Sequence, residues 1–432
     1  MKKCGNPLLC MVFLICLVNT LWAIDFGEDS YGSLTDYLRD IYGIDNNAGL
    51  TAFPVLNVPL GGRAEGMAGS FSAVSDDISF LEWNPAGSSL LAKTELAFFH
   101  NNWIADTKIE GAAFASRLKD FGFAAGGKWL YTPFTEYNIY GERASKGYYS
   151  EVVGVLNGSY NFLSGYYFTG ISLGINIKGA FRFVPDYSDA DDRENLTGSL
   201  ASGSGSSQSA AMAMADIGVL TRINFLKFYN SRERNLSFAL VARNLGPPAM
   251  DDPLPTVAVA GLSWKPLRPI LLSFDYSFPI NMVNLDLSEK PYWAMGLSTQ
   301  ITQFLSMHAG LLTKSGNVRI TLGSAVDLQR FSLDLNYTLD LLTQFTPMNR
   351  ISLGIRFNLG DQGRKAREED AEALYIKGLS AYSRGETTEA RYYWEETLKV
   401  DPRFEPASEG ISLLTRSKDL IDRIDEMQSL GF

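Results

Sequence analysis

The residues whose types and spacing could do chemistry are concentrated in the stretch 60–90. An arginine is followed by a pair of carboxylates and then by an Asn-Pro step, all set among Gly, Ala and Ser. The arginine could form an ion pair with the carboxylates, or it could receive the carboxylate of a ligand. Small residues let a backbone pack closely against a wall, and Asn-Pro enforces an extended or turn conformation. The stretch therefore predicts a compact plug, whose key residues are Arg63, Gly66, Gly69, Asp76, Asp77, Asn84, Pro85, Ala86 and Gly87.

Residues of the usual catalytic kinds are sparse elsewhere. The chain has 2 histidines, His100 and His308, which are far apart in the sequence. It has no nucleophile elbow, no metal-ligand spacing and no phosphate-binding glycine loop between a strand and a helix. The acidic pair Asp191-Asp192 is of a kind that is usually solvated in loops. We therefore expect no enzyme activity, no cofactor and no metal site. The net charge of −10 also argues against nucleic acid, whose binding needs clustered Lys and Arg.

The first residues have the pattern of a secretory signal peptide. Two lysines precede a short apolar run, and cleavage is expected after Ala23, so residues 1–23 would be removed. All 3 cysteines, at positions 4, 10 and 16, lie in this segment. Neither Cys10 nor Cys16 follows the small residue that a lipoprotein signal requires. A mature chain without cysteine would have no disulfide.

Residues 24–92 are expected to form an entry segment followed by the plug, or hatch. Apolar side chains recur at spacings of three and four between Ser30 and Gly43, which predicts one amphipathic helix. Its apolar face is interpreted as a packing face, with a membrane-surface helix as the less favoured alternative.

From Thr94 onward, apolar and polar residues alternate. In Phe331–Asp340, for example, every second residue is Phe, Leu or Tyr, and the others are Ser, Asp, Asn or Thr. About fourteen such segments fit within 93–360, each near the length of a membrane-spanning strand. The fold class is therefore predicted as all-β: a transmembrane antiparallel β-barrel of about fourteen strands with the hatch in its lumen.

The same alternation is compatible with a soluble β-sandwich. Two features favour the barrel: the apolar stripes are longer than those of most soluble strands, and aromatic residues gather near the expected strand ends. Short turns at one end and long loops at the other would fit an outer-membrane barrel. We expect Lys314–Asn317 to be a short turn, and 132–150 and 186–209 to be long connections between strands.

The composition changes after Gly360. A charged linker is predicted over 361–370, followed by a helical module over 371–432. Small residues, an aromatic residue and a proline stand at the spacing of a tetratricopeptide repeat (TPR), and Pro406–Leu430 would be a third helix. One repeat is too little to be stable alone, so this TPR-like module is expected to dock on another surface. Its predicted packing residues are Gly378, Gly385, Ala390, Trp394 and Pro402.

The hatch stretch and the strand series together resemble the FadL-type outer-membrane transporters of long-chain fatty acids and other hydrophobic compounds. The segment from Arg63 to Asn84-Pro85-Ala86-Gly87 looks like the hatch signature of that family, and Ala242–Pro247 looks like a second shared feature. The uncharacterised spirochaetal branch is the part of the family that it resembles. The resemblance covers roughly residues 55–360 and implies a hydrophobic ligand, a plugged lumen and a lateral opening in the wall. The TPR-like tail is not part of the fatty-acid transporters proper.

A carboxylate head of such a ligand would need a cation. Arg63 and the polar-face residues Lys178 and Arg182 are the candidate contacts. The alternative for Arg63 is an ion pair with Asp76 or Asp77 that fixes the plug, and the alternative for the other two is a merely polar wall.

Two functions follow as expectations. The first is an outer-membrane transporter that moves long-chain fatty acids or similar hydrophobic compounds, with membrane lipid around it and the tail in the periplasm. The second is an outer-membrane anchor or secretion and assembly barrel whose tail docks a periplasmic protein. In both, the last strand resembles the C-terminal signal that the barrel-assembly machinery reads, in Ser352–Leu359.

Overall fold

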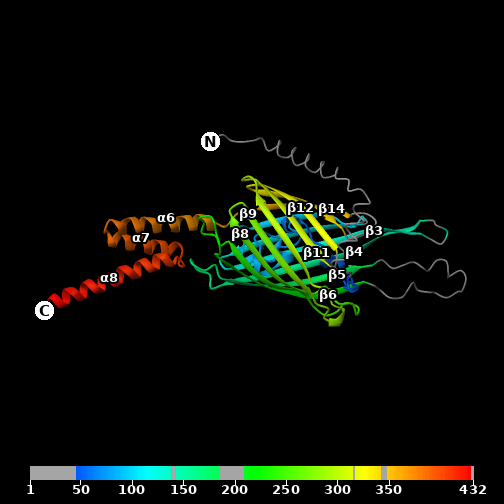
Figure 1. Cartoon of the computed structure of the whole chain (residues 1–432), viewed down its shortest axis with the longest axis horizontal. Coiled ribbons are helices and arrows are strands. Elements are labelled where there is room, and N and C mark those ends of the chain that lie inside the picture. Colours follow the sequence, from blue (N-terminus) through cyan, green and yellow to red (C-terminus); the bar gives the residue numbers. More distant parts are fainter. Residues whose placement is uncertain are drawn as a thin grey trace.

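Fourteen antiparallel strands close into a barrel in the computed structural model, as the alternation predicts (Figure 1). It describes residues 45–104, 106–137, 140, 143–184, 209–314, 317–341 and 348–429. The expected signal peptide, the helix Ser30–Gly43 and all of the connection 186–209 except Ser209 lie outside these residues. Each strand pairs with its neighbours in sequence, and the first strand, β1 (Glu95–Asn102), closes the barrel against the last, β14 (Met348–Asn358).

The remaining strands follow one another around the wall. They are β2 (Lys108–Leu118), β3 (Phe121–Tyr137), β4 (Arg143–Phe162), β5 (Ile171–Phe183), β6 (Ala210–Ile223), β7 (Leu236–Leu245), β8 (Val257–Leu267), β9 (Ile270–Pro279), β10 (Tyr292–Gln300), β11 (Leu305–Lys314), β12 (Asn317–Leu328) and β13 (Phe331–Asp340).

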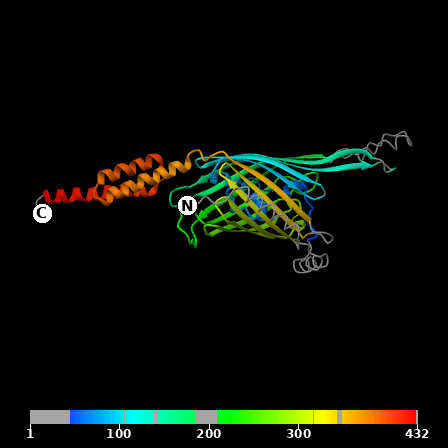
Figure 2. The same ribbon diagram turned by 90° about the horizontal axis from the view of Figure 1, so that it is seen from above.

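The barrel has two distinct ends. We call the end where β1 begins and β14 finishes the tail end, because the C-terminal helices follow there, and the opposite end the far end (Figures 1 and 2). The prediction of a long connection over 132–150 is wrong, because β3 and β4 continue as a paired ribbon to Tyr137 and Arg143 at the far end. The short β11–β12 turn is expected at the end without the long connections. However, β11 finishes at the far end, where the long connections also lie.

Side chains of the wall alternate between lumen and exterior. On β5, Leu173, Ile175 and Ile177 point outward and are 44%, 52% and 65% exposed, whereas Ser172 and Asn176 on the other face are buried against the hatch. The same pattern holds on β13, where the Asp, Asn and Thr side chains are the buried ones. An apolar band therefore faces outward, and the polar face turns toward the lumen, as on a barrel strand in a bilayer.

The hatch fills the lumen with short elements: η1 (Pro54–Asn57), α3 (Gly62–Gly66), α4 (Phe80–Trp83) and η2 (Pro85–Leu90). Wall glycines let its backbone approach the strands. A Cβ added at Gly122 would lie 2.1 Å from the carbonyl carbon of Ser88, and one at Gly174 would lie 2.2 Å from the Pro85 oxygen. The hatch is thus packed backbone to backbone against this side of the wall.

The chain enters the described part of the hatch at the far end. The Asn47 side chain donates to the Ser288 carbonyl at 3.1 Å, in the connection between β9 and β10 that contains η3 (Leu285–Leu287). The backbone N–H of Ala52 donates to the carbonyl of Pro253 at 2.8 Å, between β7 and β8. From there, the chain runs through the lumen to the start of β1 at the tail end.

Three helices follow β14: α6 (Arg364–Ser383), α7 (Thr387–Val400) and α8 (Glu405–Ser429). Trp394 is buried between them, and a Cβ at Gly378 would lie 2.4 Å from its indole nitrogen. Ala390 is also buried, and Gly385 has a φ of +84° in the turn between α6 and α7. These contacts explain the predicted small residues, while the assignment as a TPR stays a prediction. Among the described residues, no helix is both long and apolar enough to cross a lipid bilayer.

The helices dock on the tail-end rim. Arg403 pairs with Asp120 of the β2–β3 turn at 2.8 Å. The ring of Phe404 lies 4.7 Å from that of Tyr166 in the β4–β5 connection, and Arg232 covers Tyr166 from the β6–β7 connection at 4.3 Å. The helical module therefore has a defined seat on the barrel, from which it projects away from the wall (Figures 1 and 2).

The start of α6 is capped at the same rim. The carboxylate of Asp361 accepts the backbone N–H groups of Lys365 and Gly363, and these bonds hold the pKa of Asp361 below its ordinary value. The guanidinium of Arg364 donates to the carbonyls of Arg117 and Ala92, which ties the first turn of α6 to the barrel.

Candidate functional site

The hatch separates two cavities inside the barrel. The far-end cavity has a volume of about 480 Å³ and reaches from the mouth near Tyr292 and Lys314 down to the hatch. The tail-end cavity has a volume of about 370 Å³ and lies under the hatch, beside Gln300, Asp327 and Asn358. Neither cavity shares a lining residue with the other.

Two stretches of the hatch border both cavities: residues 61–69, and residues 76–79, where Asp76 and Asp77 line the tail-end cavity and Ile78 and Ser79 line the far-end cavity. In the first stretch, Gly61, Glu65 and Ala68 line the far-end cavity, whereas Arg63 lines the tail-end cavity. Hydrogen bonds from the wall hold the first stretch: Asn336 donates to the Gly62 carbonyl and Thr321 to the Gly66 carbonyl, both at 2.9 Å.

A cluster of charges lies on the tail-end face of the hatch. Arg63 contacts Asp76 at 2.9 Å and Asp77 at 3.6 Å. Arg356 of β14 contacts Asp77 at 3.1 Å and Asp334 of β13 at 3.0 Å. The ion pair proposed as the alternative for Arg63 is therefore present, and Arg356 extends it to the wall. Buried guanidinium–carboxylate pairs of this kind are costly to break one partner at a time.

The Asn-Pro-Ala-Gly turn acts as a structural joint of the hatch. The side chain of Asn84 accepts the backbone N–H of Ala86 and donates to the Ser72 carbonyl at 2.8 Å, so it links two parts of the hatch. Asn157 of β4 donates to the Pro85 carbonyl at 2.9 Å. A Cβ at Gly87 would lie 2.6 Å from that of Phe80, so only glycine fits there.

The other two hatch glycines are confined as well. Gly69 has a φ of +78°, and a Cβ there would meet the Trp83 ring at 2.3 Å. A Cβ at Gly66 would lie 3.1 Å from the Cβ of His308 on β11. The described contacts therefore place all nine residues of the predicted hatch motif inside the plug, which they shape and fix.

The two wall cations singled out from the sequence are both paired. Lys178 lines the far-end cavity but contacts Asp216 at 2.7 Å and the side-chain oxygen of Asn244 at 3.0 Å. Arg182 contacts Glu151 at 3.1 Å and is not among the residues that line the cavity. Their role as ligand contacts stays a prediction.

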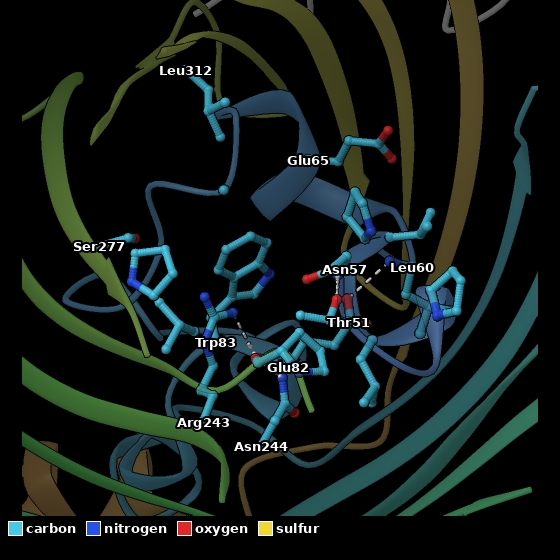
Figure 3. A pocket seen from close by; sticks show the side chains of 18 of the residues that line it. Thr51, Asn57, Leu60, Glu65, Glu82, Trp83, Arg243, Asn244, Ser277 and Leu312 are labelled. Atoms are coloured by element: carbon cyan, nitrogen blue, oxygen red, sulfur yellow. Dashed lines mark hydrogen bonds between the residues drawn. The ribbon is translucent and has the colours of Figure 1, made fainter. Parts of the chain in front are cut away.

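Arg243 of β7 is the cation that the sequence reasoning did not single out as a ligand contact. It lines the far-end cavity beside Trp83, with its guanidinium carbon 4.9 Å from the ring centre, and it donates to the Glu82 carbonyl at 3.3 Å (Figure 3). Among the residues that the structure describes, no carboxylate lies within salt-bridge distance of Arg243, and its Nε has no acceptor. Its inward position on the alternating strand, after Ala239 and Val241, was the available signal.

A second cation lies nearer the far-end mouth. Arg350 of β14 is 2% exposed and stacks on Trp103 with its guanidinium carbon 3.9 Å from the ring centre. It has one carboxylate, Asp340, at 3.7 Å, which Arg319 contacts more closely at 2.9 Å. Among the described residues, no group of three or more His, Cys, Asp or Glu side chains is arranged to hold a metal ion.

Comparison with known proteins gives the family. The profile of the uncharacterised protein family UPF0164 matches residues 43–362, which include the hatch and all fourteen strands. The chain belongs to this family. One UPF0164 protein of Treponema pallidum (strain Nichols) is 27% identical over 386 residues, which are 85% of this chain and 83% of the relative.

Two solved structures are similar to the UPF0164 barrel. A Pseudomonas aeruginosa FadL homologue aligns with a TM-score of 0.40 and 10% identity, over 68% of this chain and 97% of the homologue. The deltaS2 mutant of the TodX monoaromatic hydrocarbon channel aligns with a TM-score of 0.39 and 13% identity, over 66% of this chain and 94% of the channel.

Proposed function

We propose that this UPF0164 barrel is an outer-membrane transporter of long-chain fatty acids or similar hydrophobic compounds that carry an anionic head. The observation that carries the proposal is the far-end cavity, which combines apolar walls with Arg243, a partly buried arginine that has no carboxylate partner among the described residues. Its size falls within the range of ligand pockets, about 300–1,000 Å³. Its apolar walls come from the hatch, the far-end connections and the strands, and they include Leu56, Val58, Leu60, Leu81, Leu254 and Leu312.

Arg243 supplies the head-group contact in this proposal. A guanidinium forms two parallel hydrogen bonds with a carboxylate, and such charge-assisted bonds are stronger than neutral ones. The indole N–H of Trp83 also lacks an acceptor among the described residues, so it offers another donor beside Arg243. An alkyl chain would then lie along the apolar walls, where burial contributes about 0.8 kcal/mol for each CH₂ group.

The outward-facing apolar side chains support an outer-membrane location. A barrel satisfies its backbone hydrogen bonds within the wall, so it can expose such side chains to lipid. We place the tail end, and with it the helical module, in the periplasm. This placement rests on the resemblance to outer-membrane barrels, whose chain ends lie on the periplasmic side.

The test compares a long-chain fatty acid with the alcohol of the same chain length. We expect the purified barrel to bind the acid more tightly than the alcohol. Arg243→Leu should lower the affinity for the acid by roughly 10- to 100-fold, because a charge-assisted bond contributes about 1.5–3 kcal/mol. Binding of the alcohol should change little. Lys314→Gln is the matched control, because Lys314 lines the same cavity but is paired with Glu289.

Vesicles that contain the barrel then test transport itself. Uptake of the labelled acid should be faster than into vesicles that hold an unrelated barrel. Equal uptake, or equal binding of acid and alcohol by the unaltered protein, would refute the proposal.

A second function is favoured by one feature of α8. Five large apolar side chains on this helix are 48–60% exposed: Leu413, Leu420, Ile421, Ile424 and Met427. The alternative proposal is that the barrel anchors this module, which docks a periplasmic protein through α8. Crosslinking from α8 in intact cells tests it, and a product that contains only the barrel itself would count against it.

A further inference from the structure

We propose that the tail end of the barrel binds anionic phospholipid head groups on its outer surface. The surface, which we call the basic patch, consists of residues 224–235 between β6 and β7 and residues 264–269 at the end of β8 and in its turn into β9. The lipid belongs to the leaflet against which the tail end lies. The proposal rests on the proposed outer-membrane location but not on the cargo, because the far-end cavity plays no part in it.

The first observation is the charge of the patch. It contains five cations and one acid, in a chain whose net charge is −10. The acid is Glu233, and the cations are Lys227, Arg232, Arg234, Lys265 and Arg268. The far-end connections differ: 246–256 contains two aspartates and no cation, and 280–291 contains two acids and one lysine. The patch is therefore the surface that complements an anionic partner.

Hydrogen bonds join the two parts of the patch into one surface. The backbone N–H of Phe228 donates to the Pro266 carbonyl at 3.1 Å. The guanidinium of Arg268 donates to the Asn230 carbonyl at 2.7 Å. The cations of both parts therefore stand beside one another on a surface whose shape is fixed.

Most of the positive charge of the patch is uncompensated. Arg232 pairs with Glu372 of α6 at 3.0 Å, and Arg234 donates to the Tyr166 carbonyl at 3.1 Å, so these two help to seat the helical module. Within the described part of the chain, no carboxylate lies within salt-bridge distance of the other three cations, Lys227, Lys265 and Arg268. These three are free to meet the oxygens of a phosphate.

Lys227 is held in position for such a contact. Its ammonium donates to the carbonyls of Ser231 and Glu233 and lies 5.0 Å from the centre of the Tyr229 ring. An ammonium has three N–H donors, so one remains for a phosphate oxygen. Lys265 and Arg268 also line the tail-end cavity, whereas Lys227 does not. The patch therefore extends beyond the mouth of that cavity.

Apolar side chains show that the partner is a lipid surface and not a soluble anion. The outward apolar band reaches the tail-end parts of β6, β7 and β8 with Ile223, Phe238 and Leu262. Beyond this band, Phe225, Leu226 and Phe228 of the patch are each more than half exposed. Aromatic rings gather at the interface of a bilayer, and Lys and Arg beside them attract anionic lipids. A leaflet supplies both the apolar layer and the phosphates.

The first experiment compares phosphatidylglycerol with phosphatidylcholine of the same acyl chains. Native mass spectrometry of the purified protein in detergent measures the affinity for each lipid. We expect phosphatidylglycerol to bind at least about ten-fold more tightly, because cations at a lipid surface favour anionic head groups. The triple variant Lys227→Gln, Lys265→Gln and Arg268→Gln should lose this preference.

A matched triple variant controls for the change in net charge. Lys93, Lys119 and Arg330 are exposed cations near the tail ends of other strands and lie outside the patch. Their replacement by Gln removes the same charge and should leave the preference for phosphatidylglycerol unchanged. Rising salt concentration should weaken the preference of the unaltered protein, since exposed charges are screened.

Two further measurements identify the occupant. Glycerol phosphate has the head-group charge without the acyl chains, so it should not displace phosphatidylglycerol at equal concentration. A photo-crosslinking amino acid in place of Phe228 should attach to lipid in intact cells. Displacement by glycerol phosphate would assign the patch to a free phosphate, and a crosslink to a periplasmic protein would assign it to that protein. Either result would overturn the inference.

The lipid comparison also decides in either direction. Equal affinity of the unaltered protein for the two lipids, an unchanged preference in the patch variant, or an equal loss in the control variant would overturn the inference. If the patch variant does not assemble, Lys227→Gln alone should lower the preference, and no change in that variant would count in the same way. A barrel that prefers phosphatidylglycerol but binds no fatty acid would refute the proposed cargo alone.

Discussion

At the scale of single residues, two carboxylates of the hatch differ sharply in their surroundings. Asp77 lies between the guanidinium groups of Arg63 and Arg356. Glu65 is 3% exposed, and its hydrogen-bond partners include the neutral side chains of Asn101, Thr338 and Ser352. One acid is therefore compensated by two guanidinium groups, whereas the other has no ion-pair partner among the described residues.

This contrast gives a prediction for neutralising each acid. Asp77→Asn should destabilise the hatch by about 3–5 kcal/mol, because it leaves two buried guanidinium groups with one fewer carboxylate. Glu65→Gln should have little effect or raise stability, since the Oδ1 of Asn101 has no donor among the described residues and can accept from the new amide. Thermal unfolding of the purified barrel in detergent measures both. The opposite order of stabilities would contradict this account.

Residues also show how far the sequence leads at this site. Alternation places Lys178 and Arg182 on the polar face of the wall, and Arg243 lies on the inner face as well. It does not reveal that the first two are paired, because Asp216 and Glu151 come from neighbouring strands 38 and 31 residues away in the sequence, so that register alone brings them together. Arg243, which has no carboxylate partner in the described part of the chain, could be recognised only once these partners were known.

At the scale of elements, the wall glycines decide where the hatch can sit. Gly174 of β5 faces the Pro85 carbonyl at a distance that excludes a Cβ, whereas Gly154 of β4 has open space where its Cβ would be. The two positions are on adjacent strands and differ in what they face. They form a matched pair for substitution by alanine.

Gly174→Ala should unseat η2 and expose the hatch to protease. We expect a loss of stability of about 1–3 kcal/mol, as for overpacking in a core. Gly154→Ala should leave both stability and protease resistance unchanged. Limited proteolysis and thermal unfolding are the measurements, and equal behaviour of the two variants would show that the hatch does not depend on this contact.

The number of strands could be predicted from the period of two, and the ends of β3 and β4 could not. Within the bilayer, a strand has a lumen on one side and lipid on the other, which imposes alternation. Beyond the neighbouring strands, both faces of the β3–β4 ribbon meet solvent and the pattern is lost. Pro133 also argues against a strand by sequence, although it pairs with Tyr148 in the ribbon.

At the scale of the whole molecule, the described contacts of the helical module with the rim include the packing of Phe404 on Tyr166, two partly exposed ion pairs and the hydrogen bonds of Arg364. Phe404 is 1% exposed and packs on Tyr166 and Tyr375. The ion pair of Arg403 with Asp120 is partly exposed to solvent. Surface ion pairs contribute about 0–1 kcal/mol, less than a buried aromatic ring.

Phe404→Ala should therefore free the module from the rim, and Arg403→Ala should do so far less. The distribution of distances between spin labels on α7 and on the β2–β3 turn measures this. A broad distribution is expected for Phe404→Ala and a narrow one for Arg403→Ala. Two equally narrow distributions would show that the seat does not depend on the ring.

The route of the chain has a consequence for how this barrel is made. The hatch is described from residue 45 at the far end, and β1 begins at residue 95 at the tail end. Residues 45–94 therefore pass through the lumen from one end of the barrel to the other. The barrel closes around this segment where β1 pairs with β14, and the other twelve strands lie between these two in the sequence. A chain segment with bulky side chains cannot pass through a barrel that is already closed and packed. The hatch must therefore be in place along the inner face before β1 and β14 pair. The pairing of β14 with β1 then encloses the hatch in the lumen.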